Sequence, residues 1–345
     1  MAWHGYRALP SYFGGKRKLC PRIFKEISLI YSTDRWHSLR IVDPFLGGGA
    51  VSLYAKARGF VVWCGDLAER SVITGQALIA NDAVYLTDAD LLQLFAPVEA
   101  NRHLLESSYV PDHFTLESAR FLDQAFAVAD SLSDPTKRAL VRLLLMKYVL
   151  SLRPHAHFSS PRAFNRPLAE GRYDDIKGIY HEALAANLEH PLPALRRLAR
   201  VINQSVMRGA QPCRVMKAEA RETIAAGRGA EILYLDPPYA GTLAYEKEYR
   251  VLDELLGESY DTSGFSSSDG LNQLAELLST CQEYPLWVIS YGNAVAGLEE
   301  VTRVIADFRP VRALEIAYEH LPSMSSAEKR DRNREFLLLA GEGVA

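Results

Sequence analysis

The sequence predicts an α/β domain that is divided by a long, mainly helical insert. Strand and helix signals alternate through the first third of the chain and return after Gln211. Between these parts, from about Asn81, the pattern turns helical and then rich in loops. Because apolar runs of strand length that alternate with helices are typical of parallel sheets, we expect residues 1–84 and 212–345 to fold together, with residues 85–211 as the insert.

The first third contains a βαβ unit. LRIVDPF is rich in strand-forming residues, GGAVSLYAKARG fits a helix that ends at Gly59, and FVVWCGD reads as a second strand. In the insert, helices are expected over residues 86–106, 118–132, 134–152 and 191–204. Asp134 suits the N-cap of the third helix, and Pro135 suits its first position.

The last third returns to strands. We expect them in CRVMKA, EILYLDPPY, YPLWVISYGN and VTRVIADF. EIAYEHL and REFLLLAG follow as a final pair, joined by the basic stretch SMSSAEKRDRN. This pair predicts a C-terminal β-hairpin with a basic loop.

Composition is ordinary for a soluble globular protein of 345 residues, with 48% hydrophobic and 23% charged residues. No signal peptide and no apolar run long enough to span a bilayer is visible, so a cytoplasmic protein is expected. The four cysteines are scattered, which predicts reduced, mostly buried thiols. His155 and His157 have no partner cluster, so no metal is expected.

Charge is distributed unevenly along the chain. Residues 135–221 contain 16 Lys and Arg against 6 Asp and Glu, although the whole chain has a net charge of −3. Such clustering is the footprint of a surface that contacts nucleic-acid phosphates. A solvated helical face explains the charge equally well, and the count alone does not separate the two.

Two strand ends carry candidate ligand-binding residues. DPFLGGGA, from Asp43, is a glycine-rich turn that permits close backbone approach to a ligand at a helix N-terminus. The second strand ends at Asp66, where dinucleotide-type folds place the acidic residue that holds a ribose. NAD, nucleotides and S-adenosylmethionine all carry that ribose, so the pattern leaves the nucleoside open.

A third strand end carries candidate catalytic residues. EILYLDPPY is an apolar run that must stop at Asp236, because proline cannot donate to a strand ladder. The carboxylate, a rigid carbonyl and an aromatic ring then lie where open α/β sheets bind ligands. Near the N-terminus, SYFGGKRKL lacks the spacing of a P-loop, so an NTPase is not expected.

Taken in order, YFGGK, DPFLGGG, Asp66, a long insert and DPPY resemble the Dam-type (D12 class) family of DNA adenine-N6 methyltransferases. The resemblance implies a Rossmann-like class I S-adenosylmethionine-dependent methyltransferase fold with a helical DNA-recognition insert. It also implies S-adenosylmethionine as cofactor and double-stranded DNA as substrate. The cofactor-binding residues implied are Tyr12, Gly14, Gly15, Lys16, Asp43, Phe45, Gly47, Gly49, Asp66 and Asp236.

The same resemblance makes Asp236, Pro237, Pro238 and Tyr239 the catalytic tetrapeptide. The Asp236 carboxylate and the Pro237 carbonyl would accept hydrogen bonds from the adenine amine, and Tyr239 would stack on the base. Both contacts require the adenine to leave the duplex, so base flipping is implied. A strict general-base role for Asp236 is left open, because the proton can leave after methyl transfer.

The insert supplies candidate DNA contacts. AFNRPLAEGRY, residues 163–173, is similar to an FNxP segment that the family carries in its DNA-binding region, whereas LRPHAHFSSPR departs from the family's GATC-reading pattern. The DNA-binding residues expected are Arg153, Arg162, Asn165, Arg166, Arg172, Lys177, Lys329 and Arg330, with Arg332 and Arg334 as further candidates from the hairpin.

Other readings stay open at this point. The same chemistry on RNA adenine, or on cytosine N4, is the nearest alternative, although cytosine enzymes more often have Ser in place of Asp236. A catalytically silent DNA-binding protein on the same fold is the alternative from another class. The family resemblance implies a monomer, and the sequence does not reveal the target site or a restriction partner.

Overall fold

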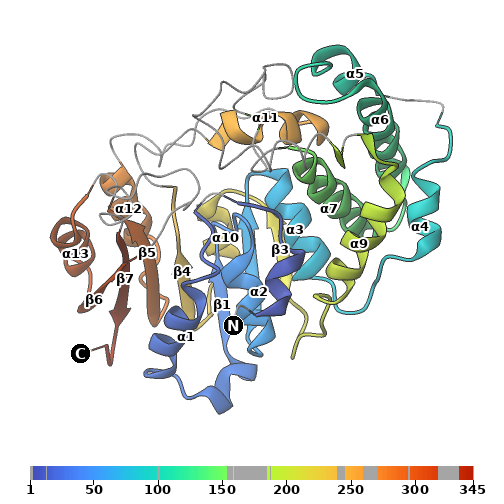
Figure 1. Ribbon diagram of the computed structural model, residues 1–345. Helices are drawn as coiled ribbons and strands as arrows, with labels where there is room; N and C mark the ends of the chain where they lie inside the picture. Colours follow the sequence, from blue (N-terminus) through green and yellow to red (C-terminus); the bar gives the residue numbers. More distant parts are fainter. Residues whose placement is uncertain are drawn as a thin grey trace. The chain divides into compact units, whose positions relative to one another are not determined.

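The computed structural model describes the ranges 3–12, 14–98, 102–153, 158, 185–186, 188–238, 245–258, 270–293, 296–317 and 334–344 (Figure 1). The chain forms two compact units. The sheet unit contains residues 14–67, 209–244 and 261–345, and the helical unit contains residues 1–13, 68–208 and 245–260. The functional division expected from the sequence, 1–84 and 212–345 against 85–211, stays a prediction.

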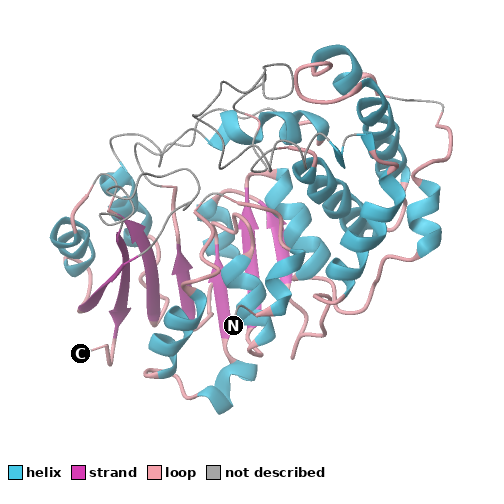
Figure 2. Cartoon of the chain, viewed as in Figure 1, coloured by secondary structure: helices cyan, strands magenta, loops and turns pink. Residues whose placement is uncertain are grey.

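Seven strands form one mixed sheet in the order β3-β2-β1-β4-β5-β7-β6 (Figure 2). All neighbours from β3 to β5 are parallel, whereas β7 runs antiparallel to both β5 and β6. The strands are β1 (Arg40–Asp43), β2 (Val61–Asp66), β3 (Arg214–Lys217), β4 (Ile232–Leu235), β5 (Leu286–Gly292), β6 (Val311–Ala317) and β7 (Arg334–Gly341). The order reverses between β1 and β4, so their carboxyl ends mark the place where open α/β sheets bind ligands.

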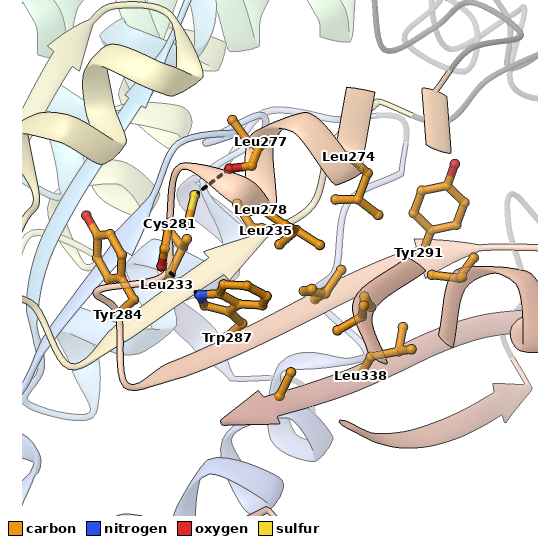
Figure 3. Close-up of a cluster of buried hydrophobic side chains, with 14 of the residues drawn as sticks. Leu233, Leu235, Leu274, Leu277, Leu278, Cys281, Tyr284, Trp287, Tyr291 and Leu338 are labelled. Atoms are coloured by element: carbon orange, nitrogen blue, oxygen red, sulfur yellow. Dashed lines mark hydrogen bonds between the residues drawn. The ribbon is translucent and has the colours of Figure 1, made fainter. Parts of the chain in front are cut away.

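One face of the sheet packs on the helices α10, α12 and α13. Leu233, Trp287 and Leu338 point to this face, where they meet apolar side chains of the helices (Figure 3). Val42 belongs to the same buried cluster. The Trp287 indole donates to the carbonyl of Cys281 at 3.0 Å, so the polar edge of the ring is satisfied inside the core. The helices are α10 (Ala220–Ala226), α12 (Gly270–Ser279) and α13 (Leu298–Ala306).

The opposite face packs on α1 and α2. Glu26 of α1 forms an ion pair with Arg312 of β6 at 2.8 Å, and Cys20 at the start of α1 contacts the carbonyl of Ala50 in α2. The remaining elements of the sheet unit are α1 (Cys20–Ser28), η2 (Thr33–Ser38) and α2 (Ala50–Ala57). The sheet is therefore covered by helices on both faces, as a mostly parallel sheet requires.

The helical unit is built around α7. Asp134 caps this helix by accepting the backbone N–H groups of Thr136 and Lys137, and Pro135 is its first residue, as predicted. α7 packs against α3, α6 and α9, so most of its side chains are buried. The unit contains η1 (His4–Ala8), α3 (Glu69–Leu78), α4 (Asp88–Gln93), α5 (Leu104–Ser108), α6 (Leu116–Ser131), α7 (Pro135–Ser151), α9 (Pro191–Asn203) and α11 (Tyr245–Leu255).

Two expectations about elements were wrong. VTRVIADF is not a strand, because most of it lies in helix α13. Glu300 accepts the backbone N–H of Gly297 at the start of this helix, and Val301 and Ile305 are buried one helical turn apart. The residues 86–106 do not form one helix but contain α4 and the start of α5.

The hairpin prediction is confirmed in its described part, since β6 and β7 pair antiparallel. Residues 318–333, which include the expected basic loop, lie outside the described ranges. All four cysteines are buried as free thiols. No helix in the described part of the chain is long and apolar enough to cross a membrane.

Candidate active site

The glycine-rich turn after β1 folds back onto the end of β2. The backbone N–H of Leu46 donates to the carbonyl of Gly65 at 3.0 Å, and that of Gly47 donates to Oδ2 of Asp66 at 2.8 Å. Gly47 and Gly49 have φ angles of 51° and 75°, which side chains other than glycine rarely adopt. Gly49 is also the N-cap of α2. The turn therefore presents its backbone beside a carboxylate at the carboxyl end of the sheet.

Asp43, the last residue of β1, is buried beneath this turn. Its carboxyl accepts a hydrogen bond from the Ser52 hydroxyl in α2 at 2.7 Å and another from the backbone N–H of Phe45 at 3.3 Å. Burial raises the pKa of Asp43 to about 7, and the neighbouring carboxylates of Asp236 and Asp66 act in the same direction. The contacts observed for Asp43 are thus with the turn and with α2, and they fix the course of the turn.

Asp236 follows β4 and forms an ion pair with a buried lysine. The Lys16 ammonium lies 2.9 Å from Oδ1 of Asp236 and also donates to the carbonyl of Gly14 at 3.0 Å. The Lys16 side chain is 3% exposed, whereas that of Asp236 keeps 19% exposure. The carboxylate is therefore held from the interior and remains accessible from outside.

Strand alternation explains why these groups meet. Val42, Leu233 and Leu235 point into the apolar core on the α10 face, so Asp43, Tyr234 and Asp236 belong to the opposite face. Tyr234 donates to the hydroxyl of Ser290 in β5 at 3.0 Å. The carboxyl ends of β1, β4 and β5 thus carry a polar group of side chains on the face covered by α1 and α2.

The two prolines of the tetrapeptide are described, and its tyrosine is not. Pro237 is buried and Pro238 is partly buried directly after Asp236. Tyr239 lies outside the described residues. The structure agrees that β4 stops at Leu235 and that Asp236 is the first residue beyond it.

Tyr12 and Gly14 fall into different units. Gly14, Gly15 and Lys16 belong to the sheet unit, whereas Tyr12 belongs to the helical unit. There its ring stacks on that of Tyr249 in α11, with centroids 5.5 Å apart. Gly14 has a φ of 72° and places its carbonyl toward Lys16. The proposed cofactor residues Gly14, Lys16, Asp43, Phe45, Gly47, Gly49, Asp66 and Asp236 are all in the sheet unit.

Most of the expected DNA contacts lie outside the described residues, namely Arg162, Asn165, Arg166, Arg172, Lys177, Lys329, Arg330 and Arg332. Arg153 is described and is buried in the helical unit, where its guanidinium donates to the carbonyl of His113 at 3.0 Å. Arg334 forms an ion pair with Glu315 at 3.1 Å across the β6–β7 pair. The burial of Arg153 favours a structural role for that side chain.

Sequence reasoning missed two side chains of this site. Ser52 holds Asp43, and Glu335 of β7 lies 3.3 Å from the Lys16 ammonium with its own side chain buried. The signal for Ser52 was its place in the first turn of the helix after a buried Asp. Glu335 was visible as the one acidic residue in the otherwise apolar run EFLLLAG. Among the described residues, no group of three or more His, Cys, Asp or Glu is arranged to hold a metal ion.

Two comparisons with known proteins agree on what this chain resembles. The family described as D12 class N6 adenine-specific DNA methyltransferase matches residues 12–125, which include the glycine-rich turn and Asp66. A curated relative, the Type II methyltransferase M2.HphI of Haemophilus parahaemolyticus, is 24% identical over 337 residues. That similarity covers 95% of this chain and 96% of the relative, so it extends through Asp236.

Proposed function

We propose that this chain, whose residues 12–125 match the D12 class of N6 adenine-specific DNA methyltransferases, methylates one adenine within a specific sequence of double-stranded DNA. S-adenosylmethionine is the proposed methyl donor. The observation that carries this assignment is the Lys16–Asp236 ion pair at the carboxyl end of β4, beside the glycine-rich turn. The fold proposed is the Rossmann-like class I methyltransferase fold, with residues 85–211 as the DNA-recognition insert.

The residues after β1 and β2 fit such a cofactor. Asp66 is partly exposed, and the Gly47 N–H fixes the direction of its carboxylate. A carboxylate held in this way can accept hydrogen bonds from the two hydroxyls of a ribose. Gly47 and Gly49 add no side chains to the last part of the turn, which permits close approach of the rest of the nucleoside. Phe45, Gly14, Gly15 and Tyr12 complete the proposed binding set.

Asp236 and Pro237 orient the reacting amine. The exocyclic nitrogen of adenine is a weak nucleophile because its lone pair is delocalised into the ring. The carboxylate of Asp236 and the carbonyl of Pro237 accept its two hydrogens, which directs the lone pair toward the methyl carbon. When bound, S-adenosylmethionine supplies an electrophilic methyl group, and its sulfur retains the electron pair of the bond that breaks. The nitrogen then loses one proton, either to the Asp236 carboxylate or to solvent after methyl transfer.

The target base must leave the duplex to reach this site. Stacking by Tyr239 and hydrogen bonding by Asp236 both need an exposed base face or edge, at a cost of a few kcal/mol for flipping. We assign the phosphate and base contacts to Arg162, Asn165, Arg166, Arg172, Lys177, Lys329 and Arg330. Arg153 supports the insert from inside, as its burial indicates.

Similarity to a protein named as a type II methyltransferase favours a restriction–modification setting, in which methylation at one sequence protects DNA. The retained Asp236 argues against a cytosine-N4 enzyme. Its ion pair with Lys16 argues against a silent DNA-binding protein, because the burial of the Lys16 ammonium beside Asp236 is costly to retain without a catalytic use.

The test compares substrates. Three reactions each contain the purified chain, S-adenosylmethionine and one nucleic acid, which is duplex DNA, single-stranded DNA or RNA. The nucleosides of each reaction are then analysed by mass spectrometry. We expect N6-methyldeoxyadenosine from the duplex, confined to one sequence context. Methylation of RNA alone would replace the proposed substrate, and N4-methylcytosine would replace the proposed base.

A further inference from the structure

Glu335 is a buried carboxylate next to the candidate active site. It lies near the start of β7, and its side chain is 1% exposed. Its Oε1 is 3.3 Å from the Lys16 ammonium, the same group that lies 2.9 Å from Oδ1 of Asp236. The ammonium therefore lies close to two carboxylates, one directly after β4 and one in β7.

The reversed direction of β7 brings Glu335 to this place. β7 is antiparallel to β5, so its first residues lie beside the carboxyl end of β5, with Glu335 opposite Gly292. Phe336 and Leu338 point into the apolar core on the α10 face, so Glu335 faces the side of Asp236. A parallel strand at this position would have put its amino end at the opposite edge of the sheet.

Among the described residues, acceptors from three parts of the chain lie close to the Lys16 ammonium. They are the carbonyl of Gly14 at 3.0 Å, Asp236 at 2.9 Å and Glu335 at 3.3 Å. An ammonium carries three donors on a flexible stem, so anchors in several directions are needed to fix its position. Glu335 is an acceptor from a third part of the chain, since Gly14 belongs to the loop of Lys16 and Asp236 directly follows β4.

We propose that Glu335 is a positioning residue for methyl transfer, which holds the Lys16 ammonium and, through it, the Asp236 carboxylate. This inference rests on the proposed function, because it assumes that Asp236 orients the adenine amine. Glu335 makes no contact with substrate in this scheme. Its negative charge keeps the Lys16 ammonium from shifting entirely toward Asp236. Glu335 thereby sets the position of the Asp236 carboxylate and the extent to which Lys16 neutralises its charge.

The test is Glu335→Gln, which keeps the size of the side chain and removes its charge. We expect the single-turnover methylation rate to fall by about 10- to 100-fold, the scale on which small misplacements of reacting groups act. The dissociation constants for S-adenosylmethionine and duplex DNA should stay within about two-fold of wild type. Glu315→Gln, on the adjacent strand β6 with a 49% exposed side chain, is the matched control and should react at the wild-type rate.

A double variant distinguishes a positioning role of Glu335 from a general loss of structure. In Lys16→Met, the proposed route from Glu335 to Asp236 is already broken, so adding Glu335→Gln should lower the rate by less than about two-fold. Rate losses that multiply in the double variant would overturn the inference. A wild-type rate for Glu335→Gln would also overturn it.

Folding is checked by thermal melting before the rates are compared. If Glu335→Gln fails to fold, Glu335→Asp answers the same question, because it keeps the charge but shortens its reach. A reduced rate with unchanged binding supports the inference, and a wild-type rate contradicts it. Asp236→Asn is measured in parallel. If that variant is fully active, the proposed function is wrong. If Asp236→Asn is inactive but Glu335→Gln is fully active, only the positioning role is wrong.

Discussion

The backbone N–H of Gly47 donates to Oδ2 of Asp66 at 2.8 Å, which joins the turn after β1 to the end of β2. One carboxylate thereby shapes the glycine-rich turn and defines one wall of the proposed nucleoside site. Because β1 and β2 pair in parallel register, both strand ends reach this edge of the sheet together.

Replacing Asp66 by Ala should weaken S-adenosylmethionine binding. The ribose hydroxyls lose their acceptor and the turn loses its hydrogen bond, so we expect the dissociation constant to rise at least about ten-fold, the effect of removing one charged hydrogen-bond partner. Isothermal titration calorimetry measures this directly. Asp307→Ala, an exposed aspartate at the end of α13, is the control, and unchanged affinity in Asp66→Ala would remove the ribose role.

Replacing Gly49 by Ala should affect stability and cofactor binding together. Gly49 has a φ of 75°, and a Cβ in this region costs about 1 to 2 kcal/mol. Gly343, with a φ of 80° and no atom within 4 Å of an added Cβ, provides the same backbone strain away from the site. Both alanine variants should melt at lower temperature, but only Gly49→Ala should bind the cofactor more weakly. Equal cofactor affinities in the two would contradict the proposed role of the turn.

The buried Asp43 should make stability depend on pH. Its pKa is about 7 in the fold, mainly through burial, against about 3.9 in an unfolded chain. A raised folded pKa stabilises the protein at low pH, and this contribution is lost as pH rises toward 7. Between pH 5 and pH 8 the wild type should lose about 2 to 3 kcal/mol relative to Asp43→Asn.

Denaturant unfolding of both proteins across that pH range checks the prediction for Asp43. The difference between the two free energies of unfolding isolates this carboxyl from the other titrating groups. A difference that stays constant from pH 5 to pH 8 would show that Asp43 is ionised throughout.

DNA affinity should fall as salt rises, because phosphate contacts release counterions. Arg162→Ala and Arg166→Ala together should reduce the slope of log affinity against log salt by about two. Arg196, which is already paired with Asp88 within the helical unit at 2.6 Å, is the control, and Arg196→Ala should leave the slope nearly unchanged. Fluorescence anisotropy with duplex DNA measures the slopes, and equal slopes in all proteins would remove the assignment of these arginines.

The local parts of the site could be predicted from the sequence. β1, the glycine-rich turn, α2 and β2 follow one another along the chain, and Gly59 ends the helix with a φ of 98°. Proline after Asp236 fixed the end of β4 in the same local way. Such features depend on backbone chemistry within a few residues, which a sequence displays directly.

The parts that depend on distant pairing could not be predicted. Nothing near Glu335 indicates that an antiparallel strand brings it to Lys16, because that contact is set by the order of the whole sheet. The error at VTRVIADF has a related cause. Its β-branched residues favour a strand by propensity, but burial of Val301 and Ile305 against the sheet selects a helix.

The most direct test of the account is methylation of duplex DNA by the wild-type chain and by Asp236→Ala, with S-adenosylmethionine and nucleoside mass spectrometry. We expect N6-methyldeoxyadenosine from the wild type and none above background from the variant, while both bind the same duplex with similar affinity. Normal methylation by Asp236→Ala would contradict the central claim that methyl transfer takes place at the carboxylate held by Lys16.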